Sequence, residues 1–164
     1  MNNMTKEQKE QDYGGDAEFY TDSNLFIYSA LDKGLIGSEA KIIIKKINDG
    51  EYNAYTSTLT IDEVLWKVQK DVGRGIASET AKKMINLKNL KFIDADIFVI
   101  QKAVEIYQTE KIDPRDSIHL ASMKKLKLNL IISSDSDFDK IKEIKRIDFT
   151  KVKHIQGYEN GNKK

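Results

Sequence analysis

The sequence predicts an α/β fold in which a parallel sheet of short strands is covered by helices on both faces. Short apolar runs typical of strands alternate with longer segments of helical periodicity, and residues 129–133 are apolar enough for a strand buried on both sides. The 164 residues include no cysteine and one proline. A single domain of this size has an ordinary core, and disulfide frameworks and thiolate metal sites are excluded.

Periodicity and turn residues place the elements along the chain. In order, we expect a strand at 19–21, helices at 24–31 and 38–49, a strand at 53–57, helices at 60–72 and 78–87, a strand at 91–93, helices at 95–107 and from 114, a strand at 129–133, a helix at 137–144 and a strand at 152–155.

Capping residues mark the ends of these helices. Ser38, Thr60 and Ser78 are the expected N-caps, because their hydroxyls accept hydrogen bonds from free N–H groups of the first turn. Pro114 suits a first helical position, where no N–H is needed. Gly50 is expected to end one helix, and the Gly-Arg-Gly sequence at 73–75 interrupts another.

Charge is distributed unevenly, although 27 Lys+Arg against 26 Asp+Glu give a net charge of only +1. Residues 1–18 hold two lysines and five acidic residues, a net charge of −3, and are expected to be a disordered acidic tail. Residues 157–164 are expected to be a second tail, which leaves a domain at 19–156. Basic residues gather at 124–127 and 140–153. No signal-peptide pattern or membrane-length apolar run is present, so we expect a cytoplasmic protein.

Acidic residues come after several predicted strands. Asp22 follows the first strand directly, and Glu63 lies in the helix after the second. Asp116 begins the helix that leads to the fourth strand, which Asp135 and Asp137 follow. The carboxyl ends of parallel strands meet at one edge of a sheet, where ligands bind. Carboxylates suit Mg²⁺ or Mn²⁺, which polarise a phosphate and activate water. The cluster therefore indicates metal-dependent hydrolysis of a phosphodiester.

Each of these acids also has a purely structural interpretation. Asp22 suits the N-cap of the following helix, and Glu63 suits a capping box. Asp116 lies in the first turn of its helix, where the helix dipole stabilises a negative charge. Asp135 and Asp137 suit a turn or an N-cap. The two interpretations are compatible, because a carboxylate at a helix N-terminus can also meet a metal. Their joint placement at one edge favours a functional role.

Three segments of the chain follow one another as TDSNLFIYSAL, STLTIDEVL and DPRDSIHLASMKKLKLNLIISSDSDFDKI. In order and spacing they resemble the PIN-domain family, most of all the VapC toxins of type II toxin–antitoxin systems, and the resemblance covers residues 19–155. It implies a three-layer α/β/α sandwich with a five-stranded parallel sheet. It also implies a Mg²⁺- or Mn²⁺-dependent endoribonuclease that forms a homodimer, cleaves RNA and is blocked by a cognate antitoxin.

The resemblance also assigns roles to individual residues. The catalytic acids of the family match Asp22, Glu63, Asp116 and Asp135, which are expected to bind the metal together with Asp137. Supporting polar residues are expected at Asn24, Ser57 and Ser133. Flanking phosphates of the substrate are expected at Arg115, Lys124 and Lys140, although a solvated Arg115 is an equal alternative.

Other residues favour structural roles. Trp66 is interpreted as part of the core or of a dimer interface, in preference to a platform for base stacking, and His119 as a structural histidine. The chain departs from the family in its long acidic tail and in the Gly-Arg-Gly break before the helix that ends near residue 87.

Three other functions remain open at this point. The first is a PIN nuclease of RNA processing or decay that has no antitoxin. The second is a PIN-like adaptor that binds RNA or protein without cleaving, against which the four intact acids argue. The third is a phosphoryl-accepting receiver domain, which would need a lysine where residues 133–137 place acids.

Overall fold

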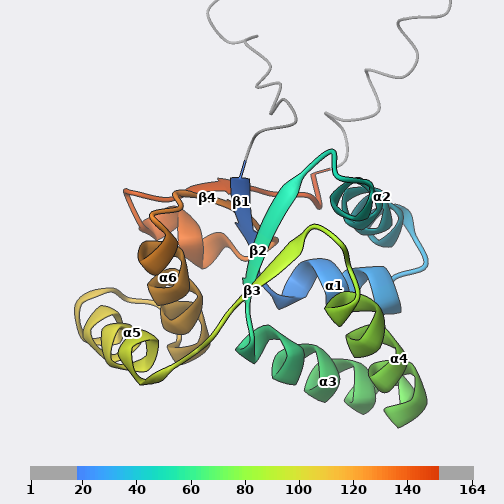
Figure 1. Ribbon diagram of the computed structural model, residues 1–164, viewed down its shortest axis with the longest axis horizontal. Coiled ribbons are helices and arrows are strands. Elements are labelled where there is room, and N and C mark those ends of the chain that lie inside the picture. Colours follow the sequence, from blue (N-terminus) through green and yellow to red (C-terminus); the bar gives the residue numbers. More distant parts are fainter. Residues whose placement is uncertain (1–17, 152–164) are drawn as a thin grey trace, which may run out of the picture.

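Five parallel strands form the centre of the computed structural model, which describes residues 18–151 (Figure 1). The strands are β1 (Glu18–Thr21), β2 (Asn53–Ser57), β3 (Leu90–Ile93), β4 (Leu130–Ile132) and β5 (Lys145–Ile147). The helices are α1 (Ser23–Leu31), α2 (Leu35–Asp49), α3 (Leu59–Val72), α4 (Arg74–Ile85), α5 (Ile97–Thr109), α6 (Pro114–Leu126) and the short 3₁₀ helix η1 (Ser136–Lys140). Within the described residues, no helix combines the length and apolar character needed to cross a lipid bilayer.

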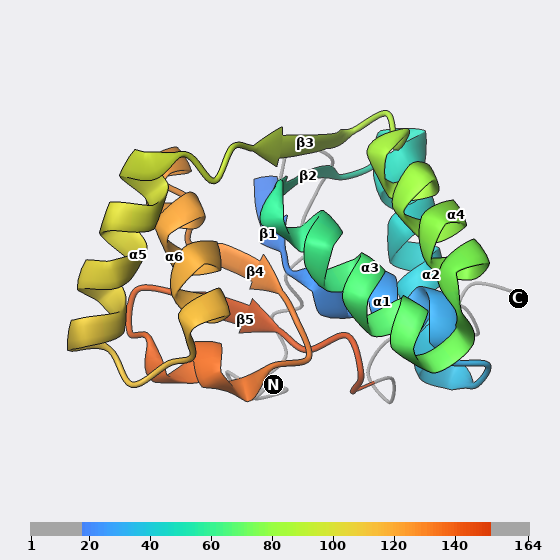
Figure 2. The same ribbon diagram turned by 90° about the horizontal axis from the view of Figure 1, so that it is seen from below.

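Helices cover both faces of the sheet, as predicted. Figure 2 shows α1, α2, α3 and α4 on one face and α5 with α6 on the other. The alternation of β1 explains the two layers, because Phe19 packs in the cluster that includes Leu25 and Val64, whereas Tyr20 packs with Met123 and Ile131. The predicted α/β/α sandwich with a five-stranded parallel sheet is confirmed.

The strand order decides which strand ends lie together. It is β3-β2-β1-β4-β5, so β1 is the central strand, with β2 on one side and β4 on the other. The register pairs Tyr20 with Tyr55 of β2 and with Ile131 of β4. The residues that follow β1 and β4 therefore meet at the carboxyl edge, together with the start of α3.

Two serine N-caps were predicted wrongly. Helix α2 begins at Leu35 after Gly34, and Ser38 lies inside the first turn, where its Oγ donates to the Gly34 carbonyl at 2.9 Å. Gly73 separates α3 from α4, so Ser78 lies inside α4. A serine hydroxyl bonds equally well to a carbonyl four residues earlier, so the residue type alone does not place the helix start.

The start of α3 also differs from the prediction. The helix begins after Thr58, and Thr60 is buried within it, where it accepts a hydrogen bond from the Thr56 hydroxyl at 2.8 Å. The predicted N-cap at Thr60 is therefore wrong. Glu63 is one turn further on and lines a cavity at the sheet edge.

The last elements of the chain were assigned wrongly as well. In place of a helix at 137–144, the structure has η1 followed by β5, which pairs with β4 through Leu130–Lys145 and Ile132–Ile147. Apolar residues at 141, 144 and 147 have helical spacing, and only pairing with β4 selects a strand. The strand predicted at 152–155 and the two tails lie outside the described residues, except that Glu18, the last residue of the predicted first tail, belongs to β1. The domain limit at 156 stays a prediction.

Gly37 of α2 packs closely against the end of α1. The N–H groups of Gly34 and Gly37 donate to Asp32 Oδ1 at 2.7 and 3.0 Å, and a Cβ added at Gly37 would lie 2.0 Å from the Asp32 carbonyl oxygen. We expect Gly37→Ala to lower the free energy of unfolding by about 1–3 kcal/mol in urea denaturation. Gly75→Ala is the control, because a Cβ there meets nothing within 4 Å and alanine favours the helix by roughly 0.5–1 kcal/mol. Equal stability of the two variants would contradict the close packing.

Candidate active site

Asp22 stands at the centre of the carboxyl edge, between the end of β1 and the start of α1. It caps α1 by accepting a hydrogen bond from the Asn24 N–H at 3.1 Å. Its Oδ2 accepts hydrogen bonds from Asn24 Nδ2 at 3.2 Å and from Ser133 Oγ at 2.6 Å. Asp22 is only 3% exposed, and two of the three predicted supporting residues, Asn24 and Ser133, contact it. The capping and functional interpretations of Asp22 are therefore compatible.

The loop after β4 brings a second carboxylate to this edge. The N–H of Asp135 donates to Ser133 Oγ at 2.9 Å, so one serine links Asp22 to this loop. Asp135 caps η1 by accepting from the Asp137 N–H at 2.8 Å. The carboxylate of Asp137 pairs with Lys140 at 2.7 Å instead of lining the cavity described below.

Glu63 enters the edge from α3 beside a buried histidine. Its Oε1 lies 3.3 Å from His119 Nε2, yet makes no hydrogen bond. The His119 ring is 1% exposed, and its Nδ1 is 2.9 Å from the Tyr20 hydroxyl of β1. His119 thus belongs to a buried network, as its structural interpretation predicted, and the network reaches the acidic edge.

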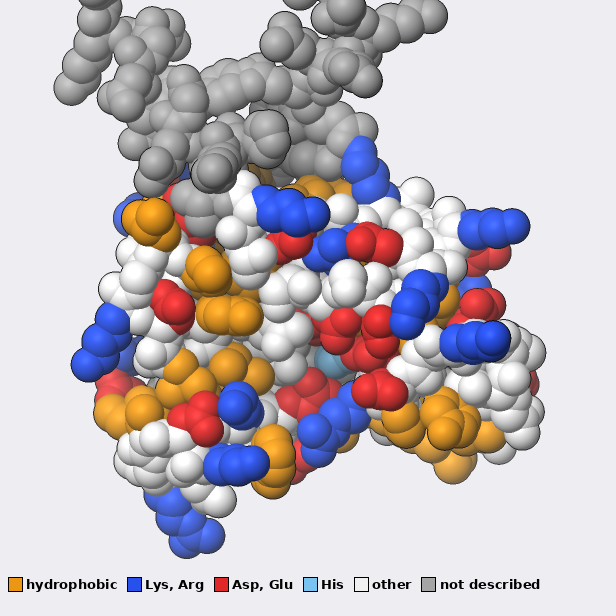
Figure 3. All heavy atoms as spheres, turned by 180° about the vertical axis from the view of Figure 1, so that it is seen from behind, with side chains coloured by type: hydrophobic (Ala, Val, Ile, Leu, Met, Phe, Trp, Pro, Cys, Tyr) orange, Lys and Arg blue, Asp and Glu red, His pale blue; other side chains and the backbone are white. Residues whose placement is uncertain are grey.

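These acids surround one cavity of about 400 Å³. Figure 3 shows acidic side chains grouped around the described histidine on this face. Asp22, Glu63 and Asp135 come from β1, α3 and the end of β4, and Asp116 comes from the first turn of α6. The lining residues with ionisable side chains are Asp22, Glu63, Asp113, Arg115, Asp116, His119 and Asp135. The four predicted catalytic acids therefore share one cavity.

Burial shifts the titration of this group of acids. Burial raises the pKa of Asp22 to about 6, against the opposing effect of His119. Burial and the neighbouring Asp135 raise the pKa of Asp116 to about 7.

Burial alone would raise the pKa of Glu63 and lower that of His119. At His119 the effects of Tyr20, Glu63 and Asp22 outweigh burial and raise its pKa well above the ordinary value. At Glu63 the effects of His119, Ser23 and Arg115 outweigh burial and lower its pKa.

The donor set suits a hard divalent cation. Mg²⁺ and Mn²⁺ prefer carboxylate oxygens, and Glu63 Oε1 is buried here without a hydrogen-bond donor. The raised pKa values of Asp22 and Asp116 report the cost of placing negative charge at this edge, which a cation would remove. As the side chains stand, however, no three metal-ligating residues in 18–151 are close enough together to hold an ion.

The PIN domain family matches residues 19–144, the segment that contains all four acids. The chain belongs to the PIN domain family. Two proteins with similar sequences carry the name ribonuclease. Ribonuclease VapC6 of Methanocaldococcus jannaschii is 30% identical over 143 residues, which cover 73% of this chain and 93% of that protein. Ribonuclease VapC2 of the same organism is 27% identical, and the match covers 84% of this chain and 94% of VapC2. The predicted likeness to VapC proteins is thereby confirmed.

Solved VapC structures share the PIN fold. VapC20 of Mycobacterium tuberculosis, described as a Sarcin-Ricin loop cleaving toxin, has a TM-score of 0.63 at 13% identity and covers 75% of this chain and 93% of its own. VapBC2 of Rickettsia felis, bound to a DNA fragment of its promoter, has a TM-score of 0.61 at 12% identity. The match covers 80% of this chain and 98% of the VapBC2 chain. At such identities the comparison concerns the fold alone.

The predicted phosphate-binding residues lie in different places on this PIN domain. Arg115 lines the acidic cavity. Lys124 pairs with Glu143 at 2.8 Å and lines a separate hollow between α5 and α6, and Lys140 pairs with Asp137. Arg115 is thus the one predicted cation that the structure brings to the cavity.

The last predicted supporting residue, Ser57, acts at the start of α3. It is fully buried at the end of β2, and its Oγ accepts a hydrogen bond from the Leu59 N–H at 3.2 Å. Ser57 therefore contacts the turn that leads to Glu63, and it makes no hydrogen bond to a carboxylate of the cavity within the described residues.

The prediction overlooked three residues near this PIN site. Asp113 lines the cavity, and its spacing of three from Asp116 is a helical signal that was available. Tyr20 bonds His119 from β1, but the two residues are 99 positions apart and no local pattern connects them. Arg146 of β5 donates to the Ser133 carbonyl at 3.1 Å, which depends on a strand that the sequence did not reveal.

Arg146 is expected to hold the loop that carries Asp135. Its side chain is 5% exposed and also pairs with Asp139 at 2.6 Å and Asp148 at 3.2 Å. Arg146→Leu leaves Asp148 without its nearly buried partner, so we expect the free energy of unfolding to fall by about 2–4 kcal/mol. Arg74→Leu, at an exposed position on α4, should change it by less than about 0.5 kcal/mol. Denaturant curves compare the two, and equal values would show that the Arg146 contacts contribute no stability.

Proposed function

We propose that this protein is the ribonuclease toxin of a toxin–antitoxin pair and that it hydrolyses RNA with Mg²⁺ or Mn²⁺. The observation that carries the proposal is the joint position of Asp22, Glu63, Asp116 and Asp135 around one cavity. The relatives support RNA as the substrate, because VapC6 and VapC2 are named ribonucleases. PIN-domain VapC nucleases generally depend on divalent metals.

The acids and their partners have distinct roles in this proposal. A divalent cation bound by Asp22, Asp116 and Asp135, with Glu63 completing its shell or supporting a second ion, would polarise the phosphate and activate water. Asp137 joins this set if its contact with Lys140 opens. Ser133 and Asn24 hold Asp22 in one orientation through three hydrogen bonds.

The remaining charged groups of the cavity position the acids and the substrate. His119, whose Nε2 lies 3.3 Å from Glu63 Oε1, would orient that carboxylate, so His119 is a positioning residue and does not itself transfer a proton. The Arg115 guanidinium lines the cavity and would bind a phosphate oxygen of the substrate. Lys124 and Lys140 lie further away and would attract the RNA backbone over a longer distance.

Partners follow from the same relatives. The solved neighbours include toxin–antitoxin complexes, among them VapBC of Salmonella typhimurium at a TM-score of 0.60 and 15% identity. We propose that a cognate antitoxin binds this chain and blocks the acidic cavity, that the toxin forms a homodimer, and that it acts in the cytoplasm.

Cleavage of a mixed RNA pool tests the activity directly. Purified protein is incubated with the pool in EDTA, Mg²⁺ or Mn²⁺, and the ends of the products are mapped. We expect discrete cleavage products with either cation and intact RNA in EDTA. Cleavage that is undiminished in EDTA, or RNA that stays intact with both cations, contradicts the proposed hydrolysis.

The toxin assignment has its own test. Expression of the protein should arrest growth, and co-expression of the product of an adjacent small gene should restore it. RNA cleavage in vitro without any growth arrest would instead identify a nuclease of RNA processing or decay that has no antitoxin.

A further inference from the structure

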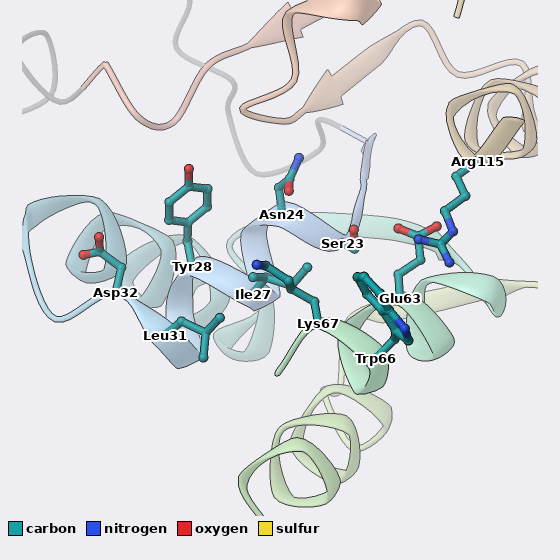
Figure 4. Close-up of a pocket in the computed structure, with 10 residues that line it drawn as sticks. All are labelled: Ser23, Asn24, Ile27, Tyr28, Leu31, Asp32, Glu63, Trp66, Lys67 and Arg115. Carbon is teal, nitrogen blue, oxygen red and sulfur yellow. The ribbon is translucent and has the colours of Figure 1, made fainter. Parts of the chain in front are cut away.

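Trp66 lies in a groove that continues from the acidic cavity. The groove has a volume of about 460 Å³ and runs between α1 and α3, with Ile27, Tyr28 and Leu31 along it (Figure 4). Ser23, Asn24, Glu63 and Arg115 line both the groove and the acidic cavity, so the two spaces adjoin. Trp66 is 51% exposed, so the core half of its structural interpretation is wrong, and the dimer-interface half stays a prediction.

Cations gather around the Trp66 ring. Lys70 Nζ lies 5.1 Å and Arg115 Cζ lies 5.8 Å from the centre of the ring, both at cation–π distance. Lys67 lines the groove beside Trp66, while its amine also contacts Asp71 at 3.0 Å. An exposed aromatic ring surrounded by basic side chains is the combination that binds single-stranded nucleic acid, because bases stack on the ring and phosphates meet the cations.

We propose that this groove binds the single-stranded RNA next to the scissile phosphate and that one base stacks on Trp66. The proposal rests on the proposed function, because the acidic cavity defines where the scissile phosphate lies. A base on the indole displaces the flexible side chain of Arg115 or Lys70, which then becomes free to pair with a flanking phosphate. Stacking on a ring tolerates every base, so Trp66 strengthens binding of unpaired RNA without selecting a sequence.

The position of the groove favours RNA over a protein segment. An apolar groove alone fits either partner, but this one opens into the carboxylate cavity at its Trp66 end, where Arg115 also lies. A nucleotide strand that delivers a phosphate to that cavity must continue along an adjoining surface, and this groove adjoins it. The hollow that contains Phe98, between α5 and α6, also carries lysines but shares no lining residue with the acidic cavity.

Intrinsic fluorescence tests the proposal at one residue, because Trp66 is the single tryptophan of the chain. The Asp22→Asn variant in Mg²⁺ keeps the RNA intact while a single-stranded RNA of about ten nucleotides is titrated. We expect tryptophan emission to be quenched as the RNA saturates the protein. An RNA of the same length with abasic sites should bind more weakly and quench less at equal occupancy, because it offers phosphates without bases.

Side-chain replacements test the contribution of stacking to affinity. Binding of fluorescein-labelled RNA is followed by anisotropy in the same Asp22→Asn background. Trp66→Ala should weaken binding by roughly 5- to 100-fold, whereas Trp66→Phe retains a ring and should lose less. Phe98→Ala is the matched control, because it removes a 75% exposed ring outside the groove, and it should change affinity by less than about twofold.

The outcomes separate this proposal from the proposed function. The base-stacking site alone would be overturned by two results together in a protein that cleaves RNA. In the first, RNA leaves the tryptophan fluorescence of the Asp22→Asn protein unchanged, and in the second, Trp66→Ala binds RNA with unchanged affinity. Quenching by RNA in a protein that never cleaves it would overturn the hydrolysis and leave this site standing. If Trp66→Ala abolishes self-association or antitoxin binding without changing RNA affinity, a protein occupies the groove and the proposal is wrong.

Discussion

Asp22→Asn is expected to lower the rate of RNA cleavage by about 100- to 1,000-fold. Asp22 lies at the centre of the acidic cavity and is oriented by three hydrogen bonds, so an asparagine removes the best-positioned negative charge. The fold should persist, because asparagine is as good an N-cap as aspartate and α1 stays capped. Single-turnover cleavage of a labelled RNA in Mg²⁺ measures the rate, and circular dichroism checks the fold.

Asp94→Asn is the matched control for this prediction. Asp94 directly follows β3 at the same edge of the sheet, but it is exposed and does not line the acidic cavity. Its replacement should change the cleavage rate by less than about twofold. Equal losses in the two variants would show that general negative charge at this edge, and not the site around Asp22, supports cleavage.

Metal-free protein is expected to lose about 2–3 kcal/mol of unfolding free energy between pH 5 and pH 8. Burial raises the pKa of Asp22 to about 6, so the folded state keeps a proton that the unfolded state releases near its ordinary value. The pKa of Asp116, raised to about 7, acts with the same sign, reduced because this residue is partly exposed. Stability from these protons is lost as the pH rises through 6 and 7.

The other shifted groups do not reverse this sign. The pKa of His119 is raised by the groups around it, so the stability that its folded-state proton contributes also falls as the pH rises. The lowered pKa values of Glu63 and of paired surface carboxylates such as Asp139 change stability only below about pH 5. Above pH 5 their contributions are complete and constant.

Urea denaturation in EDTA and in Mg²⁺ at pH 5 and pH 8 measures this dependence. Mg²⁺ should restore stability at pH 8, because the cation replaces the protons among the carboxylates. Asp116→Asn should raise the stability of the metal-free protein at pH 8 and flatten its pH dependence, since one unfavourable charge is gone. A metal-free protein that becomes more stable from pH 5 to pH 8 would contradict the raised pKa values.

Metal removal and the Asp22 variant test two different properties of the site. Metal removal measures how much stability the protein loses when its carboxylates lack a cation, and the Asp22→Asn variant measures how much the cleavage rate depends on one of those carboxylates. If Mg²⁺ stabilises the protein but Asp22→Asn still cleaves RNA at the wild-type rate, the cation binds elsewhere or the reaction uses other acids. Agreement of the two results would place binding and chemistry in the same cavity.

Local signals in the sequence were sufficient for the type and order of most elements. Apolar spacing over a few residues distinguishes the helix at 24–31 from the strand at 53–57, and a proline marks the start of α6. Where one pattern suited two structures, the prediction failed. Ser38 has a cap residue type although it bonds back within a turn, and the apolar residues at 141, 144 and 147 have helical spacing although residues 145–147 pair with β4.

The tertiary structure decided which acids meet. An acidic residue stands within three positions after β1, β3, β4 and β5, as Asp22, Asp94, Asp135 and Asp148, and the strand pattern alone does not separate them. Only the resemblance to PIN segments singled out Asp22 and Asp135. The strand order puts β1 and β4 side by side at the centre and β3 and β5 at the edges, so Asp22 and Asp135 share a cavity that the other two do not line. Contacts between distant segments set this order.

The same distinction applies to Trp66. Its type and helical position were evident from the chain, and they favoured a buried residue. Only the packing of α1 against α3, with α6 close by, leaves the ring half exposed beside the acidic cavity and within reach of Arg115. Periodicity and capping act over a few residues and therefore predict elements, whereas a site assembled from β1, α3, α6 and β4 depends on how those elements pack.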